Sequence, residues 1–192
     1  MLQIAISPGC VEAALAAGEL ACPGCSGRLS PWGFACSREV RLAREVRPLT
    51  PRRARCGVCE TTHVLCPSWT IPRRRDGAEV IGEALRLAAT GAGHRPIARQ
   101  IGRPEGTVRG WLRAARRRAW SLRACATRRI VALDYEPAAV TPTDSELGDA
   151  VEAIMLAVRA WVLRFGCDNL GPWERAVWLT GGLLHGHPRL PP

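Results

Sequence analysis

The sequence contains no lysine, so all 27 of its strongly basic residues are arginine. This uniform choice is typical of a high-GC genome, and we infer no function from it. The chain also lacks a run of about 18 uninterrupted apolar residues, which excludes a membrane-spanning helix. Residues 4–20 include two glutamates and no basic start, unlike a secretory signal. We therefore expect a soluble, cytoplasmic protein whose nine cysteines are metal ligands or free thiols rather than disulfides.

Acidic residues are few where basic residues are many. The net charge is +10 overall, and residues 71–129 hold 15 arginines against 4 acidic residues. Residues 130–192 reverse this balance, with 4 arginines against 8 acidic residues. The basic middle of the chain favours a polyanionic partner. An apolar content of 47% is typical of a folded globular protein.

Two C-x2-C pairs stand on either side of a spacer, at Cys22 and Cys25 and at Cys56 and Cys59. Such pairs are typical of zinc ribbons, in which two tight knuckles supply four thiolates to a tetrahedral ion. The spacer, residues 29–55, suits a short β-hairpin better than a helix. We therefore predict a structural Zn2+ site, whose four protein ligands leave no open position for catalysis. The alternative is four free thiols in a small core.

Three further residues lie near these pairs. His63 and Cys66 follow the second pair, and Cys36 lies within the spacer. Each is expected to be a spectator more readily than a ligand, but His63 and Cys66 remain candidate zinc ligands.

The expected fold is mainly α with a small β zinc ribbon. The ribbon comes first, a central three-helix unit of the helix-turn-helix, homeodomain-like type follows, and a helical segment ends the chain. The expected boundaries are a short helix plus the ribbon in 1–70, an arginine-rich linker in 71–76, the helix-turn-helix domain in 77–129, a loop in 130–148, a helical pair in 149–184 and a tail in 185–192.

The helix-turn-helix prediction depends on apolar periodicity on both sides of Gly102. A scaffold helix begins at Asp76, which with Glu79 resembles a capping box. Two short helices then follow, the first with Ile97, Ala98 and Ile101 on one face and the second with Val108, Trp111 and Leu112. Nothing in the sequence breaks the last helix before about Arg129.

The side chains left outside this unit are polar and mostly cationic, as a major groove accepts. The residues expected to contact bases are Glu105, Thr107, Arg109 and Arg113. Those expected to contact phosphates, which add affinity without sequence information, are Arg95, Arg99, Arg103, Arg116, Arg117 and Arg118. In the linker, Arg73, Arg74 and Arg75 form either a candidate DNA-binding arm or a solvated connector.

An apolar stripe at helical spacing covers residues 149–165. It packs either on the rest of the chain or on a second copy, so a homodimer through this helix is a candidate assembly. Residues 130–192 offer carboxylates, but their helical pattern lacks the strands on which a two-metal nuclease site would be built. We therefore expect no catalysis.

Several short motifs resemble those of an uncharacterised bacterial family of helix-turn-helix proteins. They are the Cys-Pro-Gly-Cys and Arg-Cys-Gly-Val-Cys knuckles, Thr62-His63, Pro67, the segment 107–111, Trp173 and the segment 179–182. The helix-turn-helix is also similar to those at the front of insertion-sequence transposases, where a zinc ribbon beside it is familiar. The resemblance implies binding to double-stranded DNA, and Cys36 and Cys66 depart from its pattern.

The function expected from these patterns is non-catalytic DNA binding, as a transcriptional regulator or a mobile-element accessory factor. Two alternatives remain open. The chain is a truncated transposase-like protein that keeps its DNA-binding part, or a zinc-ribbon adaptor that binds other proteins.

Overall fold

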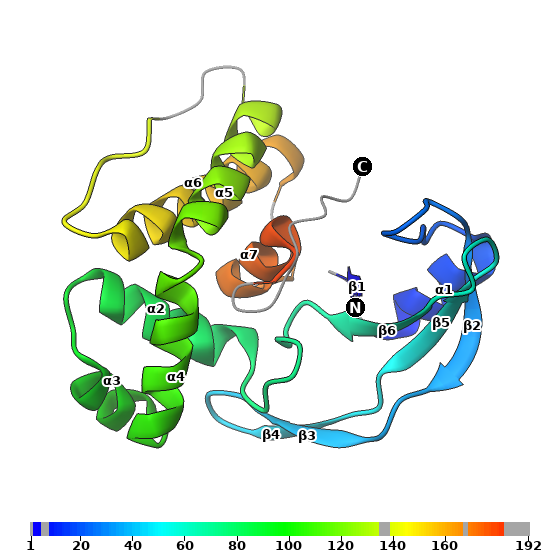
Figure 1. Ribbon diagram of the computed structural model, residues 1–192, viewed down its shortest axis with the longest axis horizontal. Coiled ribbons are helices and arrows are strands. Elements are labelled where there is room, and N and C mark those ends of the chain that lie inside the picture. The colour runs from blue at the N-terminus through cyan, green and yellow to red at the C-terminus, as the bar shows by residue number, and fades with distance from the viewer. Residues whose placement is uncertain (1, 5–7, 135–138, 167–168, 183–192) are drawn as a thin grey trace.

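Helices dominate the fold, and a small β part precedes most of them. The computed structural model describes residues 2–4, 8–134, 139–166 and 169–182 (Figure 1). Its elements are β1 (Leu2–Ile4), α1 (Pro8–Ala17), β2 (Leu29–Phe34), β3 (Arg38–Arg41), β4 (Val46–Leu49), β5 (Arg52–Cys56), β6 (Thr62–Pro67), α2 (Ala78–Ala89), α3 (His94–Ile101), α4 (Glu105–Arg116), α5 (Ala119–Leu133), α6 (Glu146–Phe165) and α7 (Pro172–Thr180). The expectation of a mainly α protein with a small β part is confirmed.

The spacer between the cysteine pairs forms strands, as expected, but it contains a second pair of strands besides the short hairpin. Strands β3 and β4 form a two-stranded sheet, nested between β2 and β5, which pair with each other. The larger sheet has the order β1-β6-β5-β2, with β1 parallel to β6 and the other pairs antiparallel. Helix α1 contributes Val11 and Leu15 to a small core shared with Leu29, Ala54 and Leu65. Cys22 and Cys56 belong to the same core.

A second and larger core includes buried residues of every helix from α2 to α7. Trp111 and Leu112 of α4 are buried there, together with Ile97 of α3 and Ile81 of α2. Between α3 and α4, Gly102 adopts a left-handed backbone (φ 63°), which glycine adopts without steric cost. The expected burial of the apolar faces around Gly102 is therefore observed, with Ile101 only partly buried.

The apolar stripe of residues 149–165 is used inside the molecule. Helix α6 packs on α2, α5 and α7, and its Val151, Ile154 and Val158 are buried in the large core. Much of the face considered for a homodimer is thus covered by the chain itself, and the homodimer stays a prediction. Towards the end of α6, Leu163 and Phe165 remain exposed.

Three boundaries differ from the sequence-based expectation. The helix expected to continue to about Arg129 breaks at Arg117 and Arg118, where α4 ends and α5 begins. The break lets Leu122 and Ala126 of α5 join the core with α6. The loop expected at 130–148 is shorter, because α5 extends to Leu133 and α6 begins at Glu146, capped by Ser145. The expected tail, 185–192, lies outside the described residues.

The backbone of segment 71–76 is held against the rest of the molecule, while Arg73 and Arg75 are exposed, so their contact with DNA stays a prediction. Ile71 is buried in the helical core, and Pro72 is buried beside it in the chain. The Ala78 amide donates to the Trp69 carbonyl (2.9 Å), and the Arg74 amide donates to the Ile71 carbonyl (3.1 Å). The arginines of this segment are therefore carried on a backbone that is held in place.

Asp76 does not cap the following helix as expected. Helix α2 begins at Ala78, after Gly77, and no side chain caps it. The Asp76 carboxylate is instead buried between two arginines, accepting from Arg41 Nη2 at 2.7 Å and from Arg103 Nε at 2.6 Å. These contacts join the β3 strand to the turn before α4.

Among the described residues, no helix combines the length and apolarity needed to cross a membrane.

Candidate functional site

The four cysteines of the two C-x2-C pairs come together at one end of the larger sheet. The Sγ atoms of Cys22, Cys25, Cys56 and Cys59 all lie within 4.8 Å of one another. The Cys22–Cys59 and Cys25–Cys56 sulfur distances are 3.7 and 3.4 Å. Four thiolates about 2.3 Å from a tetrahedral ion stand about 3.8 Å apart. The predicted grouping is therefore confirmed, and its size fits one metal ion.

Each pair sits on a turn of the same design. The Gly24 amide donates to Cys22 Sγ at 3.4 Å, and the Val58 amide donates to Cys56 Sγ at 3.3 Å. The residue after each second cysteine, Ser26 or Glu60, has a left-handed backbone with φ near 59°. Amides that point at the sulfurs stabilise thiolates, which are the form that binds metal.

The surroundings of the thiols favour loss of some of their protons. Hydrogen bonds from Thr61 lower the pKa of Cys59 to about 6. The amides of Cys59 and Val58 lower the pKa of Cys56. The Gly27 amide acts in the same direction on Cys25, but hydrogen bonds with Cys56 and Cys59 raise the pKa of that thiol to about 11. The second pair thus favours the thiolate form, whose charge a cation would neutralise.

His63 and Cys66 are placed differently from the four clustered thiols. His63 is buried, and its Nε2 lies 3.4 Å from Cys22 Sγ, at hydrogen-bonding distance. It is therefore placed to orient Cys22 from outside the four-sulfur set. Cys66 is buried on β6 opposite Gln3 of β1, and burial raises the pKa of its thiol. Cys36 is exposed in the segment after β2.

A second candidate site is the outer surface of α3 and α4. Arg95, Arg99, Arg109 and Arg113 are exposed there, while Thr107 is half-buried. Glu105 lies 3.6 Å from Arg95, and both side chains are more than half exposed. The surface therefore keeps most of its positive charge available to a partner.

Two glycines leave part of this surface bare. Gly106 and Gly110 are exposed, one turn apart on α4, and a Cβ added at either would meet open space. Each glycine costs the helix up to about 1 kcal/mol relative to alanine. Because an added Cβ would touch nothing, packing within the molecule does not require glycine at these positions. A strip without side chains permits close approach of another molecule to the helix backbone.

The arginines expected to hold phosphates differ in their exposure and in their contacts. Arg116 and Arg117 are exposed with Arg95 and Arg99, whereas Arg118 is half-buried at the α4–α5 junction. Arg103 is engaged within the molecule, because its guanidinium bonds to Asp76 and to the Leu42 carbonyl at 3.0 Å. Arg103 therefore joins two parts of the fold, and sequence reasoning had no local signal for this role.

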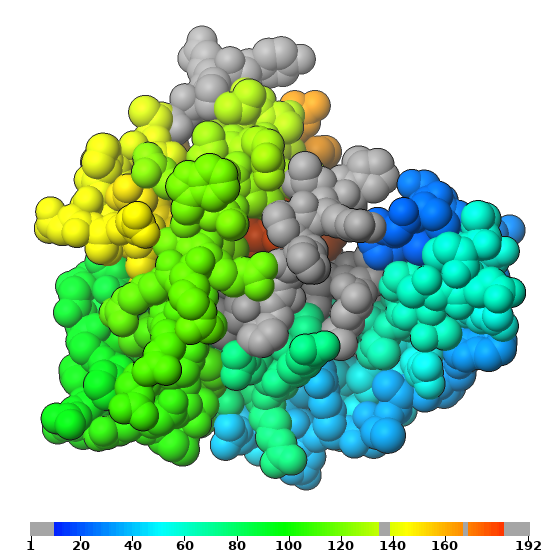
Figure 2. All heavy atoms as spheres, viewed as in Figure 1, coloured from blue at the N-terminus to red at the C-terminus, as the bar shows by residue number. Residues whose placement is uncertain are grey.

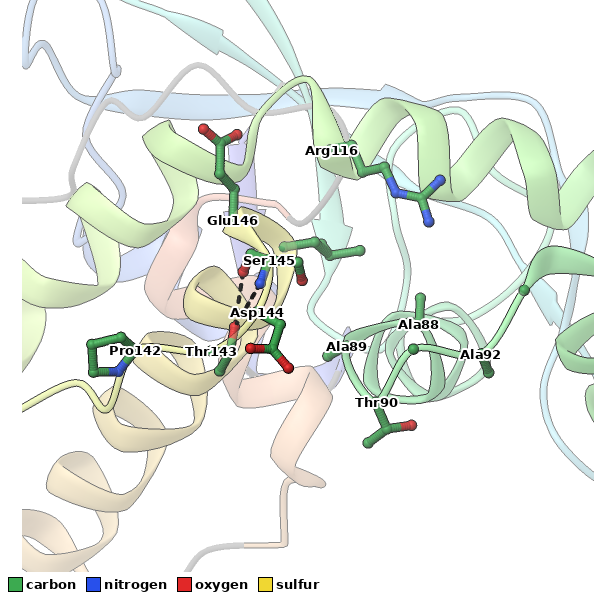
Figure 3. A pocket seen from close by; sticks show the side chains of 13 residues that line it. Ala88, Ala89, Thr90, Ala92, Arg116, Pro142, Thr143, Asp144, Ser145 and Glu146 are labelled. Atoms are coloured by element: carbon green, nitrogen blue, oxygen red, sulfur yellow. Dashed lines mark hydrogen bonds between the residues drawn. The ribbon is translucent and has the colours of Figure 1, made fainter.

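An open hollow of about 780 Å3 lies between the end of α2 and the start of α6 (Figure 3). Its lining combines Ala88 to Gly93 with Arg116 and residues 142–147. Thr143 and Ser145 hydrogen-bond with each other there, which stabilises the turn into α6. These hydrogen bonds give Thr143 and Ser145 a structural role in the turn. We assign the hollow no chemistry.

No family model, curated protein or solved structure matches this chain.

Proposed function

We propose that the protein binds double-stranded DNA without catalysing a reaction, as a transcriptional regulator or a mobile-element accessory factor. On this proposal α3 and α4 act as a helix-turn-helix, with α4 as the recognition helix in the major groove. The cysteine cluster holds a structural zinc ion and makes the β part a zinc ribbon.

The observation that carries the proposal is the exposed surface of α4. Its buried face, with Val108, Trp111 and Leu112, holds the helix against α2 and α3. The opposite face presents Arg109 and Arg113 next to the exposed Gly106 and Gly110. Arginine is the side chain most suited to guanine edges in the major groove, and the glycine strip lets the groove approach closely.

Zinc fits the donor set better than magnesium or calcium does. Four thiolates in a tetrahedral arrangement are typical of structural zinc, whereas magnesium and calcium require oxygen ligands. A small sheet with little apolar core gains folding free energy from such an ion. The ion would stabilise the β part and take no part in a reaction.

The experiment that tests the proposal is selection of the zinc-loaded protein against a pool of random duplexes. Salt of about 0.15 M suppresses binding that is purely electrostatic. We expect an enriched motif, and its symmetry would report the stoichiometry, because a palindrome requires a dimer. Absence of enrichment, with binding that vanishes as salt rises, would contradict sequence recognition and favour the adaptor alternative.

A further inference from the structure

We propose that the protein has a second DNA-contacting surface, the basic edge, formed by Arg44, Arg73 and Arg75. This inference rests on the proposed function, because it places the edge against the same duplex that α4 binds. Arg44 lies in the turn of the β3–β4 hairpin, and the other two lie in the segment before α2. All three are exposed.

The hairpin is held against the turn that precedes α4. Arg103, in that turn, donates to the carbonyl of Leu42, at the start of the hairpin turn, at 3.0 Å. Leu42 packs on the backbone at Gly77, where a Cβ would overlap its side chain. In Figure 1 the end of the hairpin accordingly points toward the helices. Arg44 is therefore carried next to the N-terminal end of α4.

The segment that carries Arg73 and Arg75 is held beside the hairpin by backbone hydrogen bonds and by one isolated bridge between Arg41 and Asp76. The Arg41 amide donates to the Arg75 carbonyl at 2.6 Å, and the Gly77 amide donates to the Arg41 carbonyl at 3.0 Å. In the space-filling view this segment (teal) projects between the helices (green) and the strands (cyan and blue) (Figure 2). The arginines of the hairpin and of the segment thus share one edge.

Asp76 fixes the edge relative to α4. Its carboxylate is only 3% exposed and accepts from Arg41 on β3 and from Arg103 before α4. Both contacts are expected to persist, because breaking either one would leave the charge of a buried carboxylate poorly compensated. The spacing of the edge from the recognition helix is therefore set before any duplex is bound.

The exposed guanidinium groups of this edge are suited to binding phosphate groups. The N-terminal residues of a recognition helix contact base edges, so a duplex bound there passes beside the hairpin turn. Exposed arginines at that place meet the sugar–phosphate backbone, to which they donate charge-assisted hydrogen bonds. Because the backbone of the edge is already ordered, little conformational entropy is lost on contact.

The test uses the zinc-loaded full chain and the duplex selected with it. Arg44→Ala and Arg75→Ala are each compared with Arg159→Ala, which removes the same charge from the exposed side of α6. Affinity is measured across a salt series. We expect each edge variant to bind every duplex about fivefold more weakly at 0.15 M salt, with the salt slope reduced by about 1. We expect Arg159→Ala to match the wild type.

A double-mutant cycle tests whether Asp76 positions the edge. In an Asp76→Asn background that keeps its fold by circular dichroism, the effect of Arg44→Ala is expected to shrink. The full effect in that background would overturn the positioning role.

The two proposals fail in different ways. Edge variants that match Arg159→Ala, while Arg109→Ala weakens binding, would overturn the basic edge and leave the recognition helix intact. A wild-type protein that binds no duplex would overturn both.

Discussion

Gly82 and Gly106 both lie within helices, but their surroundings are opposite. A Cβ at Gly82 of α2 would overlap the indole ring of Trp173, which is buried on α7. A Cβ at Gly106 of α4 would meet open space. At the scale of one residue, the first glycine therefore serves packing, and the second leaves surface bare.

Alanine substitutions are expected to separate these roles. Gly82→Ala should lower the free energy of unfolding, because overpacking against a rigid ring costs about 1–3 kcal/mol. Gly106→Ala should raise it by up to about 1 kcal/mol, through the better helix propensity of alanine. Urea denaturation of both variants checks the signs. If both substitutions changed the free energy of unfolding equally, the proposed packing of Trp173 against Gly82 would be contradicted.

Asp149 is the residue whose ionisation bears most clearly on the turn into α6. The Thr143 amide and hydroxyl donate to its Oδ1 at 2.6 and 2.9 Å, and Arg123 lies 3.0 Å from its Oδ2. The hydrogen bonds from Thr143, followed by the charge of Arg123, lower the pKa of Asp149 below its usual 3.8. The folded state therefore favours the charged form.

The sign of this shift gives a pH prediction. A carboxylate with a lowered pKa stabilises the fold at pH above 3.8, and this contribution is lost as pH falls through the lower folded pKa. Asp149→Asn should thus lower Tm at pH 7, and the Tm difference from wild type should shrink below about pH 4. Thermal denaturation at several pH values measures it. A difference that stays constant with pH would contradict the role of the charge.

On the scale of an element, α4 and its C-terminal arginines are expected to do different work. Arg109→Ala should relax sequence preference and cost about 1–3 kcal/mol on the selected site. Arg117→Ala should weaken binding to all duplexes alike and flatten the salt slope. Affinities for the selected and for a scrambled duplex distinguish the two. If both variants lose only non-specific affinity, α4 is not the recognition helix.

The bare strip of α4 provides an independent check of the approach of DNA. Gly106→Ala adds one methyl group to open surface and should leave the fold intact. If the groove approaches the helix backbone closely, this methyl should weaken binding to the selected duplex while stability rises. Unchanged affinity would show that the duplex stays clear of Gly106.

On the proposal that the cysteine cluster holds zinc, the stability of the β part depends on the ion. Cys56→Ser removes a ligand from the centre of the small core, so zinc content and thermal stability of the β part should both fall. Cys36→Ser removes an exposed thiol outside the cluster and should retain zinc. Metal analysis of the two purified variants measures the difference. Unchanged zinc in Cys56→Ser would remove that residue from the site.

At the scale of the whole molecule, the features carried by local patterns were predictable. The C-x2-C spacing predicted which thiols would come together, because a short turn fixes each pair. The 3.6-residue period predicted the buried faces around Gly102, since burial on one side of a helix imposes that period. Helix α6 was predicted for the same reason.

The features that depend on distant contacts were not predictable in this way. Asp76 stands where a capping box is expected, but it is captured by Arg41 and Arg103, which are far away in sequence. No glycine or proline marks the break after Arg116, and the packing of α5 on α6 that accompanies this break depends on residues distant in sequence. The held position of segment 71–76 likewise depends on burial of Ile71.

The contact of α7 with α2 has a consequence for synthesis on the ribosome. Trp173 reaches back to Gly82, and the Trp173 amide donates to Glu79, 94 residues earlier in the chain. At about 5–20 residues per second, α2 is made roughly 5–20 s before its partner. The β part, whose strands lie close together in sequence apart from β1, is complete by then. Nascent chains that stop before α7 would therefore expose the part of α2 around Gly82 that Trp173 covers.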